Sequence, residues 1–346
     1  MIRDTGGLIA AGLATEAVRP VEARYAIGIT AAMQALIASP EDPIGRQFVP
    51  VLAELTHLPH EMADPIGDAA HAPLPGLVHR YPDRVLLKPV LVCPVYCRFC
   101  FRREHVGPGR GALTPAQIDD ALAYIAARPA IREVILTGGD PLMLAPRRLQ
   151  ELLGRIAGMA HVELIRLHSR VPVADPGRVT AELAAALLQE TPVWLAVHAN
   201  HASEFTEQAR AALRRIQAQG VPMLGQSVLL RGVNDNADAL EALFRAMLRA
   251  RVKPYYLHQL DPAPGTSRFH VPIEEGRRLL AALRGRVTGL AWPTYVLDIA
   301  GGHGKVPIGP DYLKEDGVSD PWGGRHGLAP PQQGFAQQAG GIDAAT

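Results

Sequence analysis

Short apolar runs alternate with longer amphipathic segments from about residue 84 onward. The apolar runs are rich in Val, Ile, Leu and Tyr and predict β-strands, while the segments between them place apolar residues at helical spacing. Thr114 followed by Pro115 is typical of a helix start, because threonine caps the first turn and proline suits the first helical position. The predicted strands are 85–92, 133–137, 163–168, 193–198, 223–230 and 252–258, and the predicted helices are 115–127, 147–157, 179–189, 204–219, 236–250 and 272–284.

This alternation predicts an α/β fold built on a parallel sheet with right-handed crossovers. Such a sheet forms either a barrel or a doubly wound open sheet. Unusual polar residues follow the predicted strand ends, and in a barrel those ends converge on one mouth, whereas in an open sheet they spread along an edge. We therefore expect a partial (β/α)6 TIM-like barrel. The polar positions are the cysteine-bearing loop, 138–140, 169–170, 198 and 258–261.

Three regions are expected along the chain. Residues 1–80 combine Ala-rich periodic stretches with frequent prolines and predict a helical N-terminal extension. Residues 81–313 hold the barrel, and residues 314–346 are rich in Gly, Pro and Gln, which predicts a disordered C-terminal tail.

Composition narrows the class of protein. The 346 residues carry a formal net charge of +1, so no bulk field favours nucleic acid or a membrane surface. No apolar run is long enough to cross a bilayer, and the N-terminus lacks the basic start of a signal peptide. Reduced thiols that bind metal would fit a cytoplasmic location.

All three cysteines of the chain lie within CPVYCRFC, as Cys93, Cys97 and Cys100. Three thiolates at this spacing can hold three irons of a [4Fe–4S] cluster and leave the fourth iron open to a small molecule. A zinc site with His105 as fourth ligand is an alternative, as is a disulfide that leaves one thiol unpaired. Burial as three small apolar residues would rarely confine every cysteine to one short loop.

The cysteine spacing resembles that of radical S-adenosylmethionine enzymes, and TGGDPL at 137–142 resembles their glycine-rich segment. The likeness extends to the lysine 2,3-aminomutase family from about residue 78 to 313, through HRYPDRVLLKP, HSRVPV, GQSVLLRGVNDN, KPYYLHQLD and GGHGKVPI. The resemblance implies a barrel of the radical SAM type that uses a [4Fe–4S] cluster, S-adenosyl-L-methionine and pyridoxal 5′-phosphate.

The resemblance also implies roles for single residues. Lys305 matches the lysine that binds pyridoxal phosphate covalently, with Lys253 as the alternative. Arg80, Arg84 and Gln226 match positions that contact the cofactor phosphate. The residues expected to contact S-adenosylmethionine are Gly138, Gly139, Asp140 and His198, although His198 and His201 could instead form a metal pair.

The substrate expected from the resemblance is an amino acid with a cationic side chain. Arg102 matches the arginine that binds the substrate carboxylate, and Asp261 and Asp298 match a pair of aspartates that hold the distal ammonium. Two buried carboxylates near one point repel unless a cation lies between them. The predicted reaction moves the 2-amino group of L-lysine to C3 and gives β-lysine. Arginine or ornithine as substrate, or a non-catalytic iron–sulfur protein, are the rival interpretations.

Partners are expected from the resemblance as well. A flavodoxin or ferredoxin would reduce the cluster. Longer members carry additional cysteines that bind zinc between subunits, but this chain has Asn236 at one of those positions, so any homo-oligomer should form without zinc bridging. The short C-terminus resembles the bacterial branch that makes β-lysine for elongation factor P.

Overall fold

The computed structural model describes residues 1–314, 317–321 and 324–327. The chain forms two compact units, Met1–Gly309 and Pro310–Thr346. The first unit contains every residue to which the sequence analysis assigned a site role.

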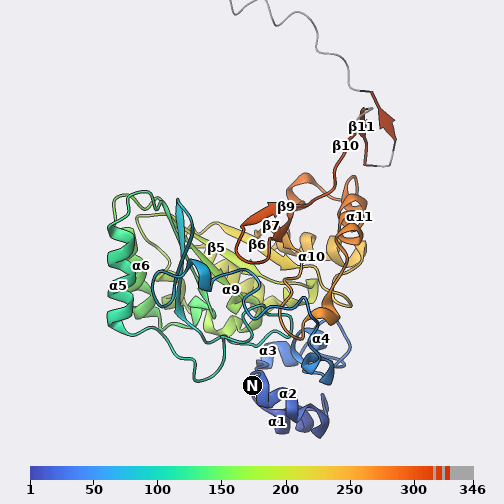
Figure 1. Cartoon of the computed structure of the whole chain (residues 1–346), viewed down its shortest axis with the longest axis horizontal. Helices are drawn as coiled ribbons and strands as arrows, with labels where there is room; N and C mark the ends of the chain where they lie inside the picture. The colour runs from blue at the N-terminus through green and yellow to red at the C-terminus, as the bar shows by residue number, and fades with distance from the viewer. Residues whose placement is uncertain (315–316, 322–323, 328–346) are drawn as a thin grey trace, which may run out of the picture. The chain divides into compact units, whose positions relative to one another are not determined.

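In the described residues, a nine-stranded sheet organises the first unit (Figure 1). Strands β2 to β8 run parallel, and β1 and β9 pair antiparallel at the two edges. Spatial order follows chain order without the reversal of a doubly wound sheet, so the expectation of a partial barrel of the radical SAM type is confirmed. The strands are β1 Leu77–Tyr81, β2 Arg84–Val90, β3 Glu133–Gly138, β4 Leu164–Ser169, β5 Val193–His198, β6 Met223–Val228, β7 Lys253–His258, β8 Thr294–Asp298 and β9 Lys305–Pro307.

The crossover helices also lie where the hydrophobic spacing predicted them. Thr114 caps the first of these helices. Its hydroxyl accepts a hydrogen bond from the backbone amide of Gln117 at 3.2 Å, and the Gln117 side chain accepts one from the backbone amide of Thr114 at 3.0 Å. The expected helix over 179–189 is shorter and ends at Ala185. The helices are α5 Pro115–Ala126, α6 Pro146–Ala157, α7 Val171–Ala174, α8 Ala181–Ala185, α9 Glu207–Gln217, α10 Ala237–Arg249 and α11 Ile273–Leu283.

The two faces of the sheet differ in polarity. Val85 and Leu87 on β2, and Ile165 and Leu167 on β4, are fully buried within one apolar core that includes the crossover helices. The alternate positions on the same strands are half-buried and carry polar groups, among them Lys88, Arg166 and His168. Because side chains alternate across a strand, these polar groups share the concave face of the barrel.

The N-terminal extension contains only short helices, which gather at one end of the first unit (Figure 1). Their apolar side chains form a second core that reaches Val95 in the cysteine-bearing loop and Ala174 after β4. The extension therefore packs directly behind the loop. Its helices are α1 Thr5–Ala10, α2 Arg19–Arg24, α3 Ala31–Gln34 and α4 Gly45–Phe48, with single 3-10 turns at 16–18, 52–55 and 69–71.

The second unit contains three short antiparallel strands among its described residues: β10 Leu313–Lys314, β11 Gly317–Ser319 and β12 Arg325–His326. The sequence predicted no regular structure here, so this part of the predicted tail differs from the expectation. Residues 328–346 of the predicted tail lie outside the described residues. Nowhere in the described part of the chain is a helix both long and apolar enough to cross a membrane.

Candidate active site

Neighbouring parallel strands bring polar side chains side by side on the concave face. His198 on β5 lies in register with Gln226 on β6, which lies in register with Tyr256 on β7. His258, the last residue of β7, is paired with Val228. The sheet thus collects residues that are far apart in sequence at the carboxyl ends of its strands, as the barrel prediction required.

Lys305 begins the edge strand β9 and faces the end of β8. Its ammonium donates to the carboxylate of Asp298, its partner in the β8–β9 register, and lies 3.2 Å from Nδ1 of His258. The fallback residue Lys253 lies at the opposite end of β7, where its ammonium donates to the carbonyls of Pro254 at 2.6 Å and Trp292 at 3.1 Å. The geometry therefore favours Lys305 as the site lysine.

Tyr81 links one of the phosphate candidates to Lys305. Its hydroxyl accepts the amide of Lys305 at 2.8 Å, and the guanidinium of Arg84 lies 3.8 Å from its ring centre. Arg84 also pairs with Asp83 at 2.7 Å and remains about one third exposed. The β1–β2 hairpin therefore places an arginine next to the strand that carries the lysine.

The two aspartates assigned to the substrate ammonium have different environments. For Asp298, burial would raise the pKa, but hydrogen bonds from His258 and Lys305 and the charge of Lys305 lower it to about 2. For Asp261, burial and the neighbouring Asp298 carboxylate raise the pKa to about 7. No described residue donates a hydrogen bond to the Asp261 carboxylate, and the charge of Lys305 only partly offsets the two effects that raise its pKa.

Opposite these acids, three cations gather around Asp68. Oδ2 of Asp68 lies 3.0 Å from Nη2 of Arg102 and 3.2 Å from Nζ of Lys88, and its Oδ1 lies 3.6 Å from Nη2 of Arg80. Burial would raise the pKa of Asp68, but the adjacent Arg102 and Lys88 lower it to about 2. The positive charges of Arg80 and Arg102 also lower the pKa of the Asp261 carboxyl. Arg80, a predicted phosphate binder, and Arg102, a predicted carboxylate binder, therefore lie within electrostatic reach of Asp261.

The three cysteines are free thiols and are half-buried in their loop. Burial raises the pKa of each thiol, and for Cys93 and Cys100 the neighbouring thiols add to the effect, bringing Cys100 to about 11. A cationic metal core would offset this repulsion between neighbouring thiolates. His105, the residue considered as a fourth zinc ligand, is exposed. Within the described residues, no three His, Cys, Asp or Glu side chains are grouped as ligands of a single metal ion.

Arg170, which follows β4, holds the loop from one side. Its Nη1 donates to Sγ of Cys97 at 2.9 Å, and its Nη2 donates to Glu204 at 2.8 Å and to Gln47 at 2.6 Å. Hydrogen bonds to cluster sulfurs are one of the means by which proteins set a reduction potential.

Glu54 of the extension holds the same loop from behind. Its carboxylate is fully buried and accepts from Arg98 at 2.5 Å and from Arg103, while Arg268 lies 3.7 Å away. Arg98 and Arg103 flank Cys100 along the chain. The extension therefore supplies the counter-charge for the arginines of the cysteine-bearing loop.

Asp140, which the resemblance assigned to S-adenosylmethionine, accepts four hydrogen bonds within the protein. Its Oδ1 accepts from the Ser169 hydroxyl at 2.7 Å and the Leu142 amide at 3.0 Å, and its Oδ2 accepts from the amides of Arg170 at 2.7 Å and Val171 at 3.1 Å. These four bonds engage both carboxylate oxygens of Asp140 and join the ends of β3 and β4.

Gly138 and Gly139 allow a close approach of two backbones. Gly138 has φ +109°, and a Cβ at Gly139 would lie 2.5 Å from the carbonyl oxygen of Val92. The amide of Gly139 donates to Val90 at 2.8 Å, and that of Asp140 donates to Val92 at 3.0 Å. These two amides therefore fix the start of the cysteine-bearing loop.

His198 presents an unpaired nitrogen to the site. Its Nε2 is buried and has no hydrogen-bond partner among the described residues, and burial lowers its pKa well below the usual value. The ring packs edge-on against Phe99 of the cysteine-bearing loop, with ring centres 5.8 Å apart. His201 instead contacts Ser203 at 2.8 Å, so the two histidines do not form the alternative metal pair.

Comparison with known proteins connects these features. Residues 87–244 match the Radical SAM superfamily and residues 280–319 match the Lysine-2,3-aminomutase family. The chain is 41% identical to the L-lysine 2,3-aminomutase of Acetoanaerobium sticklandii over 80% of its own length and 67% of the relative's. It is 39% identical to the putative L-lysine 2,3-aminomutase of Aquifex aeolicus over 87% of its own length and 82% of the relative's. The chain belongs to the lysine 2,3-aminomutase family.

The family also includes a relative with a different substrate in its name. The glutamate 2,3-aminomutase of Clostridioides difficile is 34% identical over 80% of this chain and 65% of the relative. Several of the relatives are longer proteins, and the match covers 64% of the L-lysine 2,3-aminomutase of Fusobacterium nucleatum. Membership establishes a radical SAM aminomutase, which is an isomerase, and leaves the choice of amino acid to the site.

Members of this family use a [4Fe–4S] cluster, S-adenosylmethionine and pyridoxal phosphate, and the residues present fit all three groups. Cys93, Cys97 and Cys100 are the only thiols of the chain, are free and share one loop. Buried polar atoms without described partners line the concave face, as expected where polar ligands bind. These atoms include Nε2 of His168, Nε2 of His198, Nε of Arg80 and Oδ1 of Asp68.

Sequence reasoning missed several residues that complete the site. Asp68 and Glu54 lie in the proline-rich extension, where no motif distinguishes them from surface acids. His258 was included among the polar positions expected at the strand ends, but it was given no role of its own. Tyr81 lies within the HRYPDR motif between the two predicted phosphate binders and was overlooked because it carries no charge.

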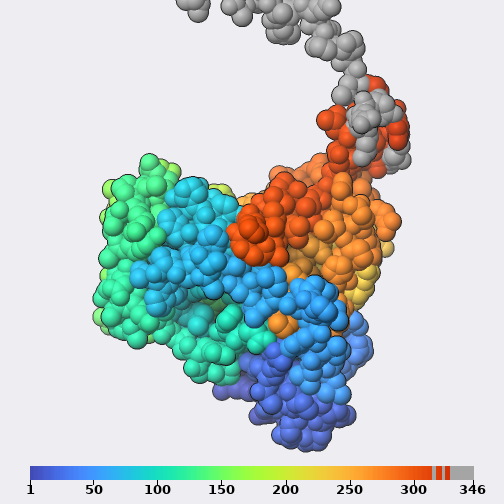
Figure 2. Space-filling view, viewed as in Figure 1, coloured from blue at the N-terminus to red at the C-terminus, as the bar shows by residue number. Residues whose placement is uncertain are grey.

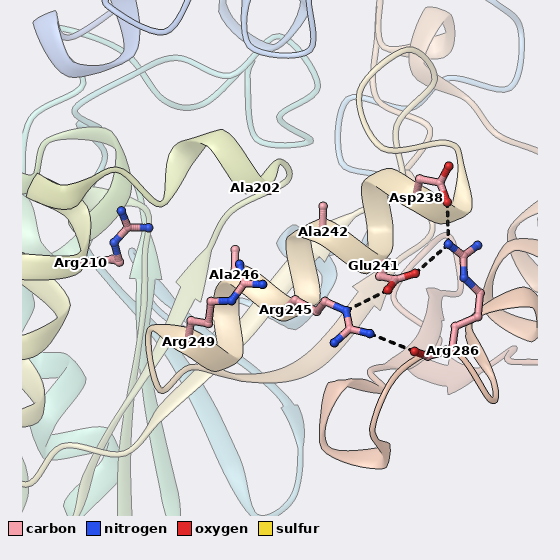
Figure 3. A pocket seen from close by; sticks show the side chains of 9 residues that line it. All are labelled: Ala202, Arg210, Asp238, Glu241, Ala242, Arg245, Ala246, Arg249 and Arg286. Atoms are coloured by element: carbon pink, nitrogen blue, oxygen red, sulfur yellow. Dashed lines mark hydrogen bonds and ion pairs between the residues drawn. The ribbon is translucent and has the colours of Figure 1, made fainter.

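A separate hollow of about 480 Å³ lies outside this site, on the solvent side of α10 (Figure 3). Its acids and arginines pair with one another: Arg286 contacts Asp238 at 2.6 Å and Glu241 at 2.7 Å, and Arg245 contacts Glu241 at 2.8 Å. None of the residues that the sequence analysis assigned to the site lines it. We therefore attach no catalytic role to this hollow.

Proposed function

We propose that this protein is a lysine 2,3-aminomutase that moves the 2-amino group of L-lysine to C3 and forms β-lysine. The observation that carries the choice of lysine is the environment of Asp261, a half-buried acid whose pKa is raised by burial and by the Asp298 carboxylate, and to which no described cation donates a hydrogen bond. The distal ammonium of lysine would supply the missing charge. A glutamate substrate would instead bring a third carboxylate to this point, where repulsion disfavours it.

Each group of the site has a task in this proposal. Cys93, Cys97 and Cys100 would hold the cluster, and Lys305 would hold pyridoxal phosphate. Bound together, the cluster and S-adenosylmethionine supply a radical that removes a substrate hydrogen, and pyridoxal phosphate carries the migrating amino group. The phosphate would lie near Arg80, Arg84 and Gln226, His198 would contact S-adenosylmethionine, and Arg102 would bind the substrate carboxylate.

The protein part of the catalysis is positioning. Arg102 has a planar fork of donors that suits a carboxylate, and Asp261 lies within electrostatic reach of it. A substrate bound at both ends is held in one orientation, so the reacting carbons stay in place while a radical exists. Walls formed by the strands and the extension would exclude water and small quenchers.

Anaerobic turnover tests the proposal directly. The reconstituted protein is incubated with dithionite, S-adenosylmethionine, pyridoxal phosphate and one amino acid at a time, and products are separated by chromatography and identified by mass. We expect β-lysine from lysine, with slower or no reaction of arginine, ornithine and glutamate. Faster formation of β-arginine or β-glutamate would contradict the choice of substrate, and the Cys97→Ser variant serves as the control without a complete cluster.

The response to pH gives a second test. Below about pH 7 Asp261 is protonated and neutral, so it cannot hold the lysine ammonium, which stays charged far above this range. We expect kcat/KM for lysine to rise as pH increases from 6 to 8, approaching about tenfold per pH unit on the acid side. Burial lowers the pKa of His198 well below its usual value, so His198 should not titrate in this window, and burial also lowers the pKa of His258.

The Asp261→Asn variant is the matched control for the pH profile. It keeps the shape of the side chain and removes its charge, so its kcat/KM should be lower and flat across the same range. If kcat/KM of the variant still changed with pH near 7, the pH dependence would belong to a group other than Asp261.

The proposal extends to partners and location. A flavodoxin or ferredoxin would deliver the electron to the cluster in the cytoplasm, and no nucleic acid would be bound at a net charge of +1. The side chain of Asn236 caps α10 by accepting the amide of Ala239 at 2.8 Å, which supports a homo-oligomer, where one forms, without a zinc bridge at this position. The β-lysine would serve either metabolism or modification of elongation factor P.

A further inference from the structure

Residues 64–71, the part of the extension just before β1, contact both sides of the proposed site. The carbonyl of Pro65 accepts the amide of Gly301 at 3.1 Å, and Nε2 of His71 lies 3.2 Å from the carbonyl of Gly302. Gly67 has φ +67°, and a Cβ there would lie 2.6 Å from the amide nitrogen of Gly302. This short segment therefore packs closely against the glycine-rich loop that leads into β9 and Lys305; Figure 2 shows the red surface of that loop beside the blue surface of the earlier residues.

Asp68, in the middle of this segment, is only 7% exposed and is the acid around which the three cations gather. Nε and Nη2 of Arg102 both donate to its Oδ2, at 3.2 and 3.0 Å. This side-on contact uses one edge of the guanidinium. Nη1 and the second hydrogen of Nη2 form the other edge, and no described residue accepts a hydrogen bond from Nη1.

The free edge of Arg102 has the fork geometry that binds a carboxylate through two parallel hydrogen bonds. The guanidinium is also held over the ring of Phe101 at 4.4 Å, which limits its rotation. Two fixed contacts thus determine which edge of Arg102 faces the site. A flexible arginine would have to lose this freedom when the substrate binds.

We propose that Asp68 is a positioning residue that orients Arg102 so that its free edge binds the α-carboxylate of the amino acid substrate. The inference rests on the proposed function and adds a residue that acts through Arg102 without contacting the substrate. Asp68 also offsets the mutual repulsion of Arg102, Lys88 and Arg80, which would otherwise spread apart.

A competing physical effect predicts the opposite change in substrate affinity when the charge of Asp68 is removed. Asp68 is an anion, so it could simply compete with the substrate carboxylate for Arg102, and removing its charge would then strengthen binding. Orientation should win because the contact is side-on and leaves the fork available, whereas a competing anion would occupy the fork itself.

The test compares two ligands that differ only at the carboxylate. L-lysine and L-lysinamide are titrated calorimetrically into the pyridoxal-phosphate-loaded protein, without reductant or S-adenosylmethionine. For Asp68→Asn we expect about a tenfold loss of lysine affinity, equal to about 1.4 kcal/mol, and less than about a twofold change for lysinamide. Glu41→Gln, which removes an exposed acid of the same extension, should change neither affinity.

The outcomes distinguish a failure of the role proposed for Asp68 from a failure of the proposed function. Equal losses for both ligands, or tighter lysine binding, would overturn the role of Asp68, whereas a wild-type protein that binds neither ligand would overturn the proposed function. Should Asp68→Asn fail to fold, Asp68→Glu retains the charge and shifts it by one methylene. The same selective loss for lysine, at smaller size, is expected there, and an equal loss for lysinamide would again contradict the inference.

Discussion

Lys305→Ala is expected to lose β-lysine formation completely and to lose covalent attachment of pyridoxal phosphate. Its ammonium reaches the carboxylate of Asp298 and lies 3.2 Å from His258, inside the site, and a methyl group cannot replace a nucleophilic amine. Borohydride reduction of the loaded wild-type protein, followed by peptide mass spectrometry, should place the pyridoxyl group on the peptide that contains residue 305. The variant should carry no pyridoxyl group after the same treatment.

Two other lysines provide the controls. Lys253→Ala should retain the label and the activity, because the ammonium of Lys253 is bound by two carbonyls at the far end of β7. Lys88→Ala should retain the label as well, although its activity should fall because Lys88 belongs to the group of cations around Asp68. A pyridoxyl group found on Lys88 or Lys253 in the wild-type protein would reject the assignment of Lys305.

Glu54→Gln is expected to reduce the free energy of unfolding by about 3–5 kcal/mol, since removing one partner of a buried ion pair leaves uncompensated charge in the interior. Glu54 is fully buried and neutralises Arg98 and Arg103, with Arg268 nearby. Burial already lowers the pKa of Arg268 to about 10, so these cations depend on their acid. Because Arg98 and Arg103 flank Cys100, iron content after reconstitution should fall together with stability.

Anaerobic urea unfolding of the metal-free protein measures this effect, with Glu41→Gln as the matched variant. Glu41 pairs with Arg46 at 3.0 Å, but its side chain is 70% exposed, so its loss should cost less than about 1 kcal/mol. If the two variants proved equally stable, the buried ionic group would have no structural importance. If Glu54→Gln had wild-type stability but low iron content, we would conclude that Glu54 matters only for binding of the cluster.

Local patterns were sufficient for most of the barrel. All six predicted strands and their crossover helices are present, since each is set by residue spacing within one segment. The β8 strand was not predicted, although Asp298 within it was recognised, because its five residues are short and begin with the exposed Thr294. Strands β1 and β9 were also missed, since edge strands depend on pairing with a neighbour more than on their own sequence.

The site residues also divide into those that local sequence identified and those whose contacts depend on the fold. The cysteines could be interpreted from the sequence because a cluster-binding loop is local, and Lys305 could be chosen because the chain has only four lysines. The role of Asp140 could not be inferred, since its four hydrogen-bond donors include Ser169 and Arg170, about thirty residues away. Motif position predicted where Asp140 lies along the chain, and only the fold defined which residues of the protein it contacts.

By itself the sequence determined the strand–helix alternation, the cysteine-bearing loop and the family to which the chain belongs. Only the tertiary structure decided which acid neutralises which cation. Asp68 precedes Arg102 by 34 residues, Glu54 precedes Arg98 by 44, and Gln47 precedes Arg170 by 123. Such pairs form only after the sheet has curled and the extension has packed behind it, because charge contacts depend on distance in space and leave no periodic trace along the chain.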